Sequence, residues 1–294
     1  ALACASTGNT AASLAAYGAL AALPVLVFVP AGKIARGKLA QAVAYGANVI
    51  EVDGDFDSAL SLVQEVCTEL GVALLNSINP YRIEGQKSAA FEIVQAFGGS
   101  APDWVVLPAG NLGNISAYGK AFHELQELGI LQRVPRLAGI QAEGANPFYL
   151  SYQTGFTRRY RVKAETVATA IRIGDPASHD RALRALKWTD GVVEQVSDEE
   201  ILLAKSKVDG SGIGCEPASA ASVAGVRKLR AKGLIRPDET VVAVLTGHLL
   251  KDPEIVLNKW EEKQRVQIDA RDRAKALRQV SELLERKMSE DHHA

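Results

Sequence analysis

Short apolar runs alternate with longer segments of mixed polarity along most of the chain. The first run opens the sequence at residues 1–5, and others follow at residues 25–29, 49–52, 72–75, 105–107, 137–140, 192–196 and 241–245. Helix-like patterns lie between them, at residues 10–20, 33–45, 56–70, 83–97, 115–128, 198–208 and 217–232. Strands separated by helices of this length imply right-handed crossovers and parallel pairing. The pattern predicts an α/β protein with parallel sheets covered on both faces.

The C-terminal stretch, residues 260–288, differs from the rest because it is highly charged. Its apolar residues recur at helix-like spacing: Val266, Ile268, Ala274, Leu277, Val280, Leu283 and Leu284. This spacing predicts an amphipathic helix of about 25 residues, which would pack on the body of the protein or form a dimer contact. A solvated tail is the alternative, given the charge density.

Composition narrows the class of protein. A chain of 294 residues that is 47% hydrophobic and 23% charged can bury a large core and would usually divide into two domains. Its net charge of -1 gives no electrostatic reason to expect nucleic acid or an anionic membrane as a partner. No apolar run approaches the roughly 20 residues that span a bilayer, and no signal peptide is visible, so we expect a cytoplasmic protein.

The three cysteines, Cys4, Cys67 and Cys215, cannot all pair within one chain. They also lack the spacing of metal ligands, so we expect reduced thiols in the core and no metal site.

A glycine-containing turn joins the apolar run at 105–107 to the following helix. Its sequence is Leu107-Pro108-Ala109-Gly110-Asn111-Leu112-Gly113-Asn114. Glycines let a backbone approach a ligand closely, and the N–H groups at a helix start favour an anion. The turn therefore predicts a phosphate cradle. A tight turn without a ligand is the alternative, because the spacing matches neither a dinucleotide fingerprint nor a nucleotide loop.

Polar motifs follow other predicted strands, where parallel α/β sheets bind ligands. Ser6-Thr7-Gly8-Asn9-Thr10 offers hydroxyl, amide and backbone donors to a carboxylate, or else is an ordinary helix cap. The loop at residues 76–87 begins with Asn76 and Ser77 and contains Arg82, which can hold a phosphate bidentately or pair with Glu84 on the surface.

Two further motifs lie near the end of the predicted body. Gly214-Cys215-Glu216-Pro217-Ala218-Ser219-Ala220-Ala221 is a helix start rich in small residues, suited to packing closely on the sheet or on a bound ring. Leu245-Thr246-Gly247-His248 ends the last strand, where a hydroxyl can hydrogen-bond a ring nitrogen. His248 could act as an acid or base, but a structural role as a hydrogen-bonding residue explains it at least as well.

Together with Ala170-Ile171-Arg172-Ile173-Gly174-Asp175-Pro176, these motifs resemble threonine synthase. The likeness runs in order from Ala1 to about Val256. It implies the fold type of the tryptophan synthase β subunit, with two parallel-sheet α/β domains. The expected division is a smaller domain at 1–78, a larger cofactor-phosphate-binding domain at 79–257 and a charged helical tail at 258–294.

The resemblance implies pyridoxal 5′-phosphate as the cofactor. Gly110, Asn111, Leu112, Gly113 and Asn114 would hold its phosphate. Asn9 would hydrogen-bond its ring hydroxyl, and Thr246 would face its pyridine nitrogen.

The resemblance also implies a substrate site and a reaction. Ser6, Thr7 and Thr10 would bind the substrate near its carboxylate, and Asn76, Ser77 and Arg82 would bind its phosphate. The substrate would be O-phosphohomoserine, converted with water to threonine and phosphate by a homodimer.

One family feature has no match here. The family tethers the cofactor as a Schiff base to a lysine in a Ser-Phe-Lys-Asp-Arg-like motif upstream of the Ser6-Thr7-Gly8 loop, and none of Lys33, Lys38 and Lys87 has those neighbours. Because residues 1–5 resemble an internal strand and the only methionine is Met288, we expect upstream residues that supply this lysine.

Other functions stay open. A threonine or serine dehydratase shares the scaffold, although an enzyme acting on a free hydroxyl needs no second phosphate site. A non-catalytic paralogue that binds the cofactor without the lysine is another alternative. A nicotinamide dehydrogenase is less favoured, because the glycine spacing is wrong and no acidic residue for a ribose lies where it should.

Overall fold

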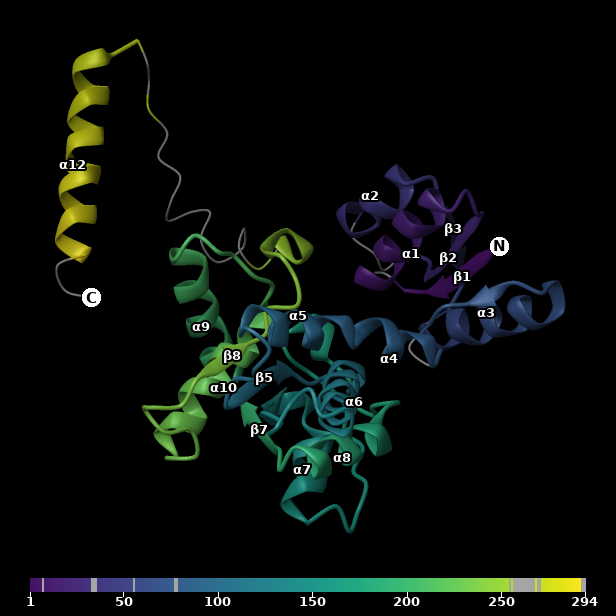
Figure 1. The fold of residues 1–294 in the computed structure, drawn as a ribbon. Helices are drawn as coiled ribbons and strands as arrows, with labels where there is room; N and C mark the ends of the chain where they lie inside the picture. Colours follow the sequence, from purple (N-terminus) through teal and green to yellow (C-terminus); the bar gives the residue numbers. More distant parts are fainter. Residues whose placement is uncertain are drawn as a thin grey trace. The chain divides into compact units, whose positions relative to one another are not determined.

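The computed structural model describes residues 1–6, 8–32, 36–54, 56–76, 79–253, 255, 268 and 271–291. The chain forms two parts, Ala1–Asp252 and Pro253–Ala294 (Figure 1). In the first part, two separate four-stranded sheets alternate with helices, and every strand pair is parallel. The α/β fold class predicted from the apolar pattern is confirmed.

The first sheet has the order β3-β2-β1-β4. Its strands are β1 (Leu2–Ala5), β2 (Val25–Pro30), β3 (Asn48–Val52) and β4 (Ala73–Leu74), and Leu2 pairs with both Val25 and Ala73. The crossovers are α1 (Asn9–Leu20), α2 (Arg36–Ala44) and α3 (Phe56–Leu70). Alternate strand residues face opposite clusters: Cys4 packs with side chains of α1, whereas Ala3 and Ala5 pack with side chains of α3. Helices therefore cover both faces of this sheet.

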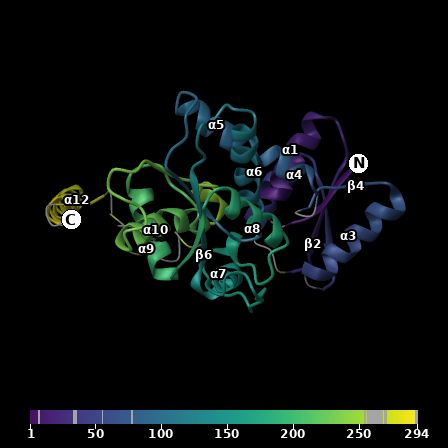
Figure 2. The ribbon, with the colours of Figure 1, turned by 60° about the horizontal axis from the view of Figure 1, so that its bottom comes forward.

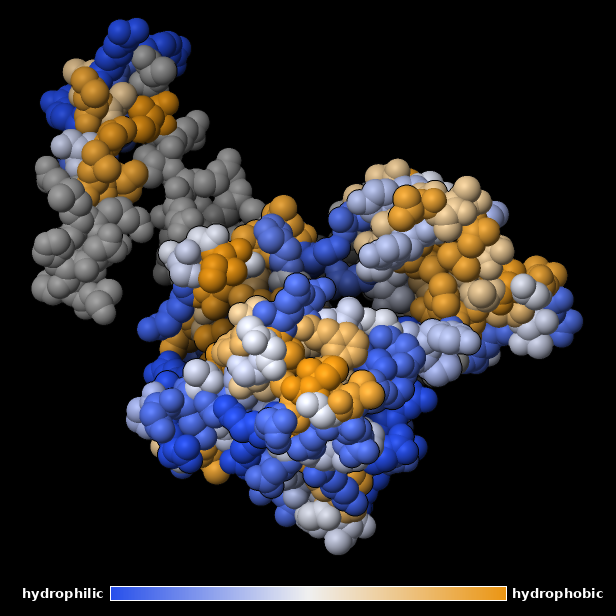
Figure 3. Space-filling view, viewed as in Figure 1, coloured by the Kyte–Doolittle hydropathy of each residue, from blue (hydrophilic) through white to orange (hydrophobic). Residues whose placement is uncertain are grey.

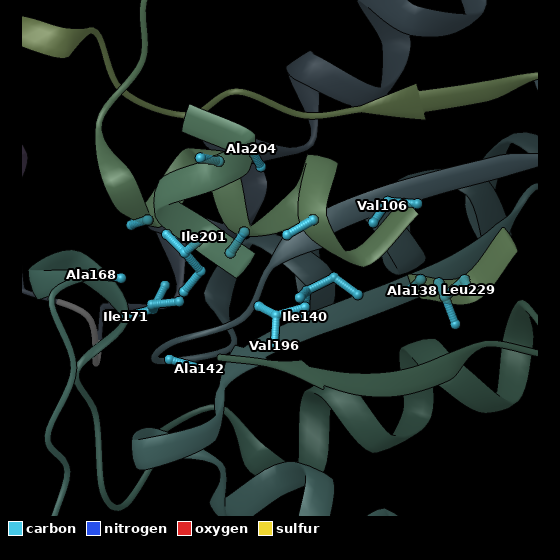
Figure 4. Close-up of a cluster of buried hydrophobic side chains, with 14 of the residues drawn as sticks. Val106, Ala138, Ile140, Ala142, Ala168, Ile171, Val196, Ile201, Ala204 and Leu229 are labelled. Atoms are coloured by element: carbon cyan, nitrogen blue, oxygen red, sulfur yellow. The ribbon is translucent and has the colours of Figure 1, made fainter. Parts of the chain in front are cut away.

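The second sheet has the order β7-β6-β5-β8. It comprises β5 (Trp104–Pro108), β6 (Arg136–Ala142), β7 (Val192–Val196) and β8 (Val241–Ala243). One face packs on α9 (Asp198–Gly210) and α10 (Pro217–Ala231), through the cluster that contains Val106 and Ile140 (Figure 4). The other face packs on α6 (Gly113–Glu127) and α8 (His179–Trp188). Burial on both faces explains the nearly continuous apolar sequence of β5.

Figure 2 shows β6 between the α9 and α10 pair and α8.

The predicted helices of this region need two corrections. The helix expected at 83–97 is divided into α4 (Tyr81–Gln86) and α5 (Ser88–Ala96), with a break at Lys87. The apolar pattern predicts neither α7 (Pro147–Gln153) nor α8. The first of these is too short to display a helical period, and its stability depends on tertiary contacts.

The second part of the chain contains α12 (Arg273–Asp291). The prediction of a helix from residue 260 is wrong at its start, because Ile268, Arg271 and Asp272 lie outside the helix. Asp272 Oδ1 accepts a hydrogen bond from the Lys275 N–H at 3.0 Å, the arrangement of a helix N-cap. The rest of the predicted stretch before it, residues 260–267 and 269–270, lies outside the described residues. Among the helices that are described, none has the length and apolar character needed to cross a membrane.

Candidate functional site

The predicted phosphate cradle is the turn between β5 and α6. Leu112 precedes α6 with a φ of 65°, a left-handed conformation that costs energy for a residue with a side chain. Its own side chain is buried in the core, which helps to hold the turn. No side chain caps α6 in the part of the chain that is described. The N–H groups of its first turn therefore remain suited to an anion.

The two glycine positions of the turn differ in what surrounds them. A Cβ on Gly110 would lie 2.9 Å from Ile171 Cα and 3.1 Å from Ala170 O, so this glycine permits a close backbone contact. Among the described residues, a Cβ on Gly113 would meet only Gln86 Oε1, at an ordinary 3.5 Å. Since neither φ nor a neighbour among these residues demands glycine at position 113, the space beside it fits a bound group.

Asn111 fastens the turn to a second loop. Its side-chain Oδ1 accepts a hydrogen bond from Ala177 N–H at 2.7 Å, and its backbone oxygen accepts one from Ser178 N–H at 3.2 Å. The residues after the 170–176 motif are thus brought against the cradle from a distant part of the sequence. Asn114, in the first turn of α6, is half-buried.

Thr246 follows β8 and is exposed, so its hydroxyl can reach a ligand. The fully buried Ser219 of α10 lies beside it, with 3.0 Å between the two hydroxyl oxygens. Ser219 Oγ also accepts a hydrogen bond from Gly247 N–H at 2.8 Å, and Glu216 N–H donates to Gly247 O at 2.9 Å. The start of α10 therefore fixes the strand end that carries Thr246.

An ion pair between the buried Lys205 and the partly exposed Asp209 supports the start of α10. Lys205 Nζ lies 2.6 Å from Asp209 Oδ2 and donates to Cys215 O at 2.7 Å. Asp209 Oδ1 accepts from Cys215 N–H at 3.1 Å. Burial raises the pKa of the Cys215 thiol to about 11, an effect partly offset by the charge of Lys205, so this cysteine is a neutral core residue. All three cysteines are free and buried, as predicted.

Ser6, Asn9 and Thr10 lie where β1 ends and α1 begins. Ser6 is half-buried and its Oγ accepts a hydrogen bond from Gly8 N–H at 3.2 Å. Asn9 is exposed in the first turn of α1 and Thr10 is half-buried. No side chain among the described residues caps α1, so this helix start also presents N–H groups. Thr7 lies outside the described residues.

Asn76 has a structural role that the sequence did not predict. Its Oδ1 accepts from Ala5 N–H at 2.8 Å and its Nδ2 donates to Ala5 O at 2.9 Å, which extends the pairing of β1 beyond β4. The Asn76 amide has a second N–H, for which no acceptor is found among the described residues and which suits a ligand. Ser77, its predicted companion, lies outside the described residues.

Arg82, on α4, is half-buried near the carboxyl end of β1. Burial lowers the pKa of its guanidinium, while the nearby Cys4 thiol acts in the opposite sense. Burial in turn raises the pKa of Cys4 to about 12, with a smaller lowering effect of Arg82. Glu84, the alternative partner expected on the surface, forms ion pairs with Lys87 at 2.7 Å and with Lys120. The Lys120 contact joins α4 to α6.

The comparison with known proteins gives the family. Residues 1–247 match the family described as "Pyridoxal-phosphate dependent enzyme". The chain belongs to this family. Pyridoxal phosphate, the cofactor implied by the resemblance to threonine synthase, is thus the cofactor of the family to which the chain belongs.

Curated relatives of this family member include threonine synthases. The chain is 52% identical to threonine synthase of Methanosarcina acetivorans over 89% of its own length and 65% of that protein. It is 48% identical to threonine synthase of Methanocaldococcus jannaschii, over 90% of the chain and 66% of that protein. The resemblance to threonine synthase is confirmed, and the chain spans about two thirds of the length of these relatives.

Solved structures share the fold at lower identity. Threonine deaminase isoform 2 from Solanum lycopersicum aligns with a TM-score of 0.74 at 21% identity, over 88% of the chain and 72% of that chain. Maize serine racemase aligns with a TM-score of 0.73 at 19% identity, over 90% and 77% respectively. These neighbours support the predicted fold type.

Two polar residues of the site region escaped the sequence prediction. Gln141, in β6, lies beside the cradle and donates to Ala109 O at 3.0 Å. The only signal for it is a polar residue at the end of an apolar strand. Ser219 belongs to a motif that the sequence explained by its small residues alone. His248 Nδ1 accepts from Leu250 N–H at 3.2 Å, an interaction of the structural kind.

Removing the buried cation of α9 should destabilise this pyridoxal-phosphate dependent enzyme. We expect Lys205→Met to lower the free energy of unfolding by about 1 to 3 kcal/mol, because it removes the donor to Cys215 O and the cation beside Asp209. Lys207→Met, at an exposed position of the same helix, is the control and should cost little. The difference in stability between the two variants is measured by denaturant unfolding, in which equal m-values show that the midpoints can be compared. Equal midpoints for the two variants would contradict the prediction.

Proposed function

We propose that this protein acts as a threonine synthase-like lyase that converts O-phosphohomoserine and water to threonine and phosphate. The observation that carries the proposal is a half-buried arginine, Arg82, at the carboxyl end of the first sheet. The cradle of the second sheet serves the phosphate of the cofactor. A second cationic group suited to phosphate favours a substrate with a phosphate of its own. The curated threonine synthases support the same reading.

Five residues of the turn, Gly110 to Asn114, would hold the phosphate of the cofactor. Gly113 leaves room for it, and the uncapped start of α6 supplies N–H donors and a favourable dipole. Asn9 would donate to the hydroxyl of the ring.

When bound, pyridoxal phosphate withdraws electrons from the substrate carbon that bears the amino group. Thr246 would place its hydroxyl at the pyridine nitrogen, with Ser219 orienting that hydroxyl. A neutral hydroxyl donates a hydrogen bond without fully protonating the ring, so it moderates this withdrawal.

The substrate would lie at the carboxyl end of the first sheet. Ser6, Thr7 and Thr10 would bind near its carboxylate, aided by the N–H groups at the start of α1. Arg82 would bind its phosphate with Ser77 and the remaining N–H of Asn76. As phosphate departs, negative charge on it grows, and a fixed guanidinium stabilises that charge more than it stabilises the bound substrate. No lysine of this chain is proposed as the tether of the cofactor.

A threonine or serine dehydratase activity is the second candidate, since solved threonine deaminases share the fold. Such a reaction removes a hydroxyl group and has no use for a second phosphate site. Arg82 therefore favours the phosphorylated substrate. We also propose that the protein is located in the cytoplasm.

The cradle assignment predicts that Gly113→Asp abolishes cofactor binding. Unit charges of like sign 4 Å apart repel by about 4 kcal/mol at an effective dielectric constant of about 20. Gly113→Asn, of equal size and without charge, should retain more cofactor and separates charge from volume. Cofactor absorbance after dialysis is the measurement. Retention by Gly113→Asp equal to wild type would remove the assignment.

The substrate assignment predicts that Arg82→Ala loses roughly 2 to 5 kcal/mol of phosphate recognition, partly in turnover. Arg82→Lys should restore little, because it keeps the charge without the planar fork. Phosphate release from O-phosphohomoserine and 2-oxobutyrate formation from threonine are measured side by side, with cofactor affinity unchanged. Arg133→Ala, at an exposed surface pair, is the control. If Arg82→Ala released phosphate normally and lost only deamination, the dehydratase function would replace ours.

We also propose a homodimer joined through α12. Leu277, Val280 and Leu284 share one face of this helix and are 72%, 40% and 58% exposed. Figure 3 shows hydrophobic residues exposed on α12. A second copy of the helix would cover this apolar stripe. Sedimentation equilibrium should give twice the chain mass, and the double variant Leu277→Glu, Leu284→Glu should give the single mass. A monomeric unmodified protein would refute the dimer.

A further inference from the structure

Gln141 is a fully buried polar residue that follows the apolar run 137–140 of β6, and both ends of its amide are hydrogen-bonded. Its Oε1 accepts from Phe148 N–H and from Tyr149 N–H, each at 2.9 Å. Its Nε2 donates to Ala109 O at 3.0 Å. We propose that Gln141 is a positioning residue that sets the geometry of the phosphate cradle and thereby the affinity for a phosphorylated cofactor. This inference rests on the proposed function, because it takes the turn after β5 as the phosphate site.

The contact with Ala109 extends the sheet by one step. Regular pairing of β5 and β6 ends at Pro108 and Ile140, after which Ala109 N–H donates to Ile140 O at 2.7 Å. The side chain of Gln141 then binds the carbonyl of the same alanine. Both backbone groups of Ala109 are therefore held by consecutive residues of β6, and the cradle starts from a fixed point.

The Ala109 carbonyl belongs to the same planar peptide group as the Gly110 N–H. In a trans peptide these two groups point in opposite directions. By holding the carbonyl, Gln141 therefore fixes the direction of the first N–H of the cradle. Gly110 itself has little freedom to adjust, because the backbone of Ala170 and Ile171 closely approaches it.

The other end of the amide fixes the orientation of Gln141. Pro147 occupies the first turn of α7 and has no N–H, so the next two N–H groups of this helix converge on Gln141 Oε1. Two donors at one end identify the oxygen of the amide, and the Ala109 carbonyl at the other end faces the NH2 group. The side chain thus links α7 to the cradle. Its oxygen must face α7 and its NH2 group must face the cradle, because the reverse orientation would place donor against donor and acceptor against acceptor.

The opposing explanation is that Gln141 only caps α7 and supports the fold. The two explanations differ in what they predict for the phosphate group. A capping role would weaken the binding of pyridoxal phosphate and of unphosphorylated pyridoxal by the same factor. A positioning role would weaken pyridoxal phosphate specifically.

The experiment measures dissociation constants of pyridoxal 5′-phosphate and pyridoxal for the full-length protein, by equilibrium dialysis with absorbance detection. We expect Gln141→Met to reduce the preference for the phosphorylated form by about tenfold, the factor that corresponds to about 1.4 kcal/mol. Ser151→Ala is the matched control: Ser151 is also fully buried and on α7, where its Oγ donates to Pro147 O at 2.9 Å. It should lower stability without changing the preference.

Gln141→Glu is the second variant, and it retains an acceptor oxygen for α7. Its carboxyl group can donate to Ala109 O only while it is protonated. The phosphate preference should therefore be close to wild type at low pH and should fall as pH rises, relative to wild type at each pH. This pH profile is not expected from a purely structural role, and it keeps the inference testable if Gln141→Met does not fold.

The outcomes separate this inference from the proposed function. If wild type shows no preference for the phosphorylated form, or if Gly113→Asp retains that preference, the turn is not the phosphate site. The cradle assignment and the positioning role of Gln141 then both fail. If Gly113→Asp abolishes the preference while Gln141→Glu leaves it unchanged at every pH, only the positioning role fails. A preference lost equally in Ser151→Ala would also overturn it, because any damage to α7 would then suffice.

Discussion

Burial of the second sheet on both faces is the constraint on which the site depends. Trp104 to Leu107 of β5 are fully buried, with α9 and α10 on one side and α6 and α8 on the other. Polar chemistry cannot be placed within such strands without a large desolvation cost. The groups suited to ligands therefore lie at the strand ends, where the chain turns into a helix and where N–H groups are left without intrahelical partners. Glu194, buried within β7, is instead paired with Lys232. The first sheet obeys the same rule at Ser6.

The turns at these strand ends are held by contacts from distant segments. Gly110 lies against the backbone of Ile171, and Asn111 binds the backbone at Ala177. The left-handed Leu112 is stabilised by burial of its side chain. In the first sheet, Asn76 takes the place of a strand residue beside Ala5. Much of the polar material near the site thus shapes the backbone and leaves a smaller set of groups for ligands.

This division bears on how one fold serves several reactions. Threonine deaminase and serine racemase have the same arrangement of strands and helices at about 20% identity, whereas the threonine synthases are about 50% identical to this chain. Function cannot be taken from the scaffold alone. In our proposal, the difference lies in residues such as Arg82, which are carried to the sheet edge by a helix after the strand. A change there alters recognition without disturbing the core.

The apolar pattern was sufficient to predict the class of fold, a run at each of the eight described strands, and the turn between β5 and α6. Local periodicity and glycine placement are properties of short segments, so they can be read without the tertiary structure. The short helix α7, the break at Lys87 and the start of α12 at Arg273 were not determined in this way. Short elements and helix boundaries depend on capping and on contacts that periodicity does not contain.

The polar residues that bind the backbone could be identified only in the folded protein. Sequence could identify Asn76 and Asn111 as polar residues after strands, but their partners, Ala5 and Ala177, are far away along the chain. Gln141 gave almost no sequence signal, because a single buried amide at the end of a strand does not show which carbonyl it binds. The physical reason is that a hydrogen bond is defined by distance and direction, and these are fixed for distant residues only when the sheets and helices have packed.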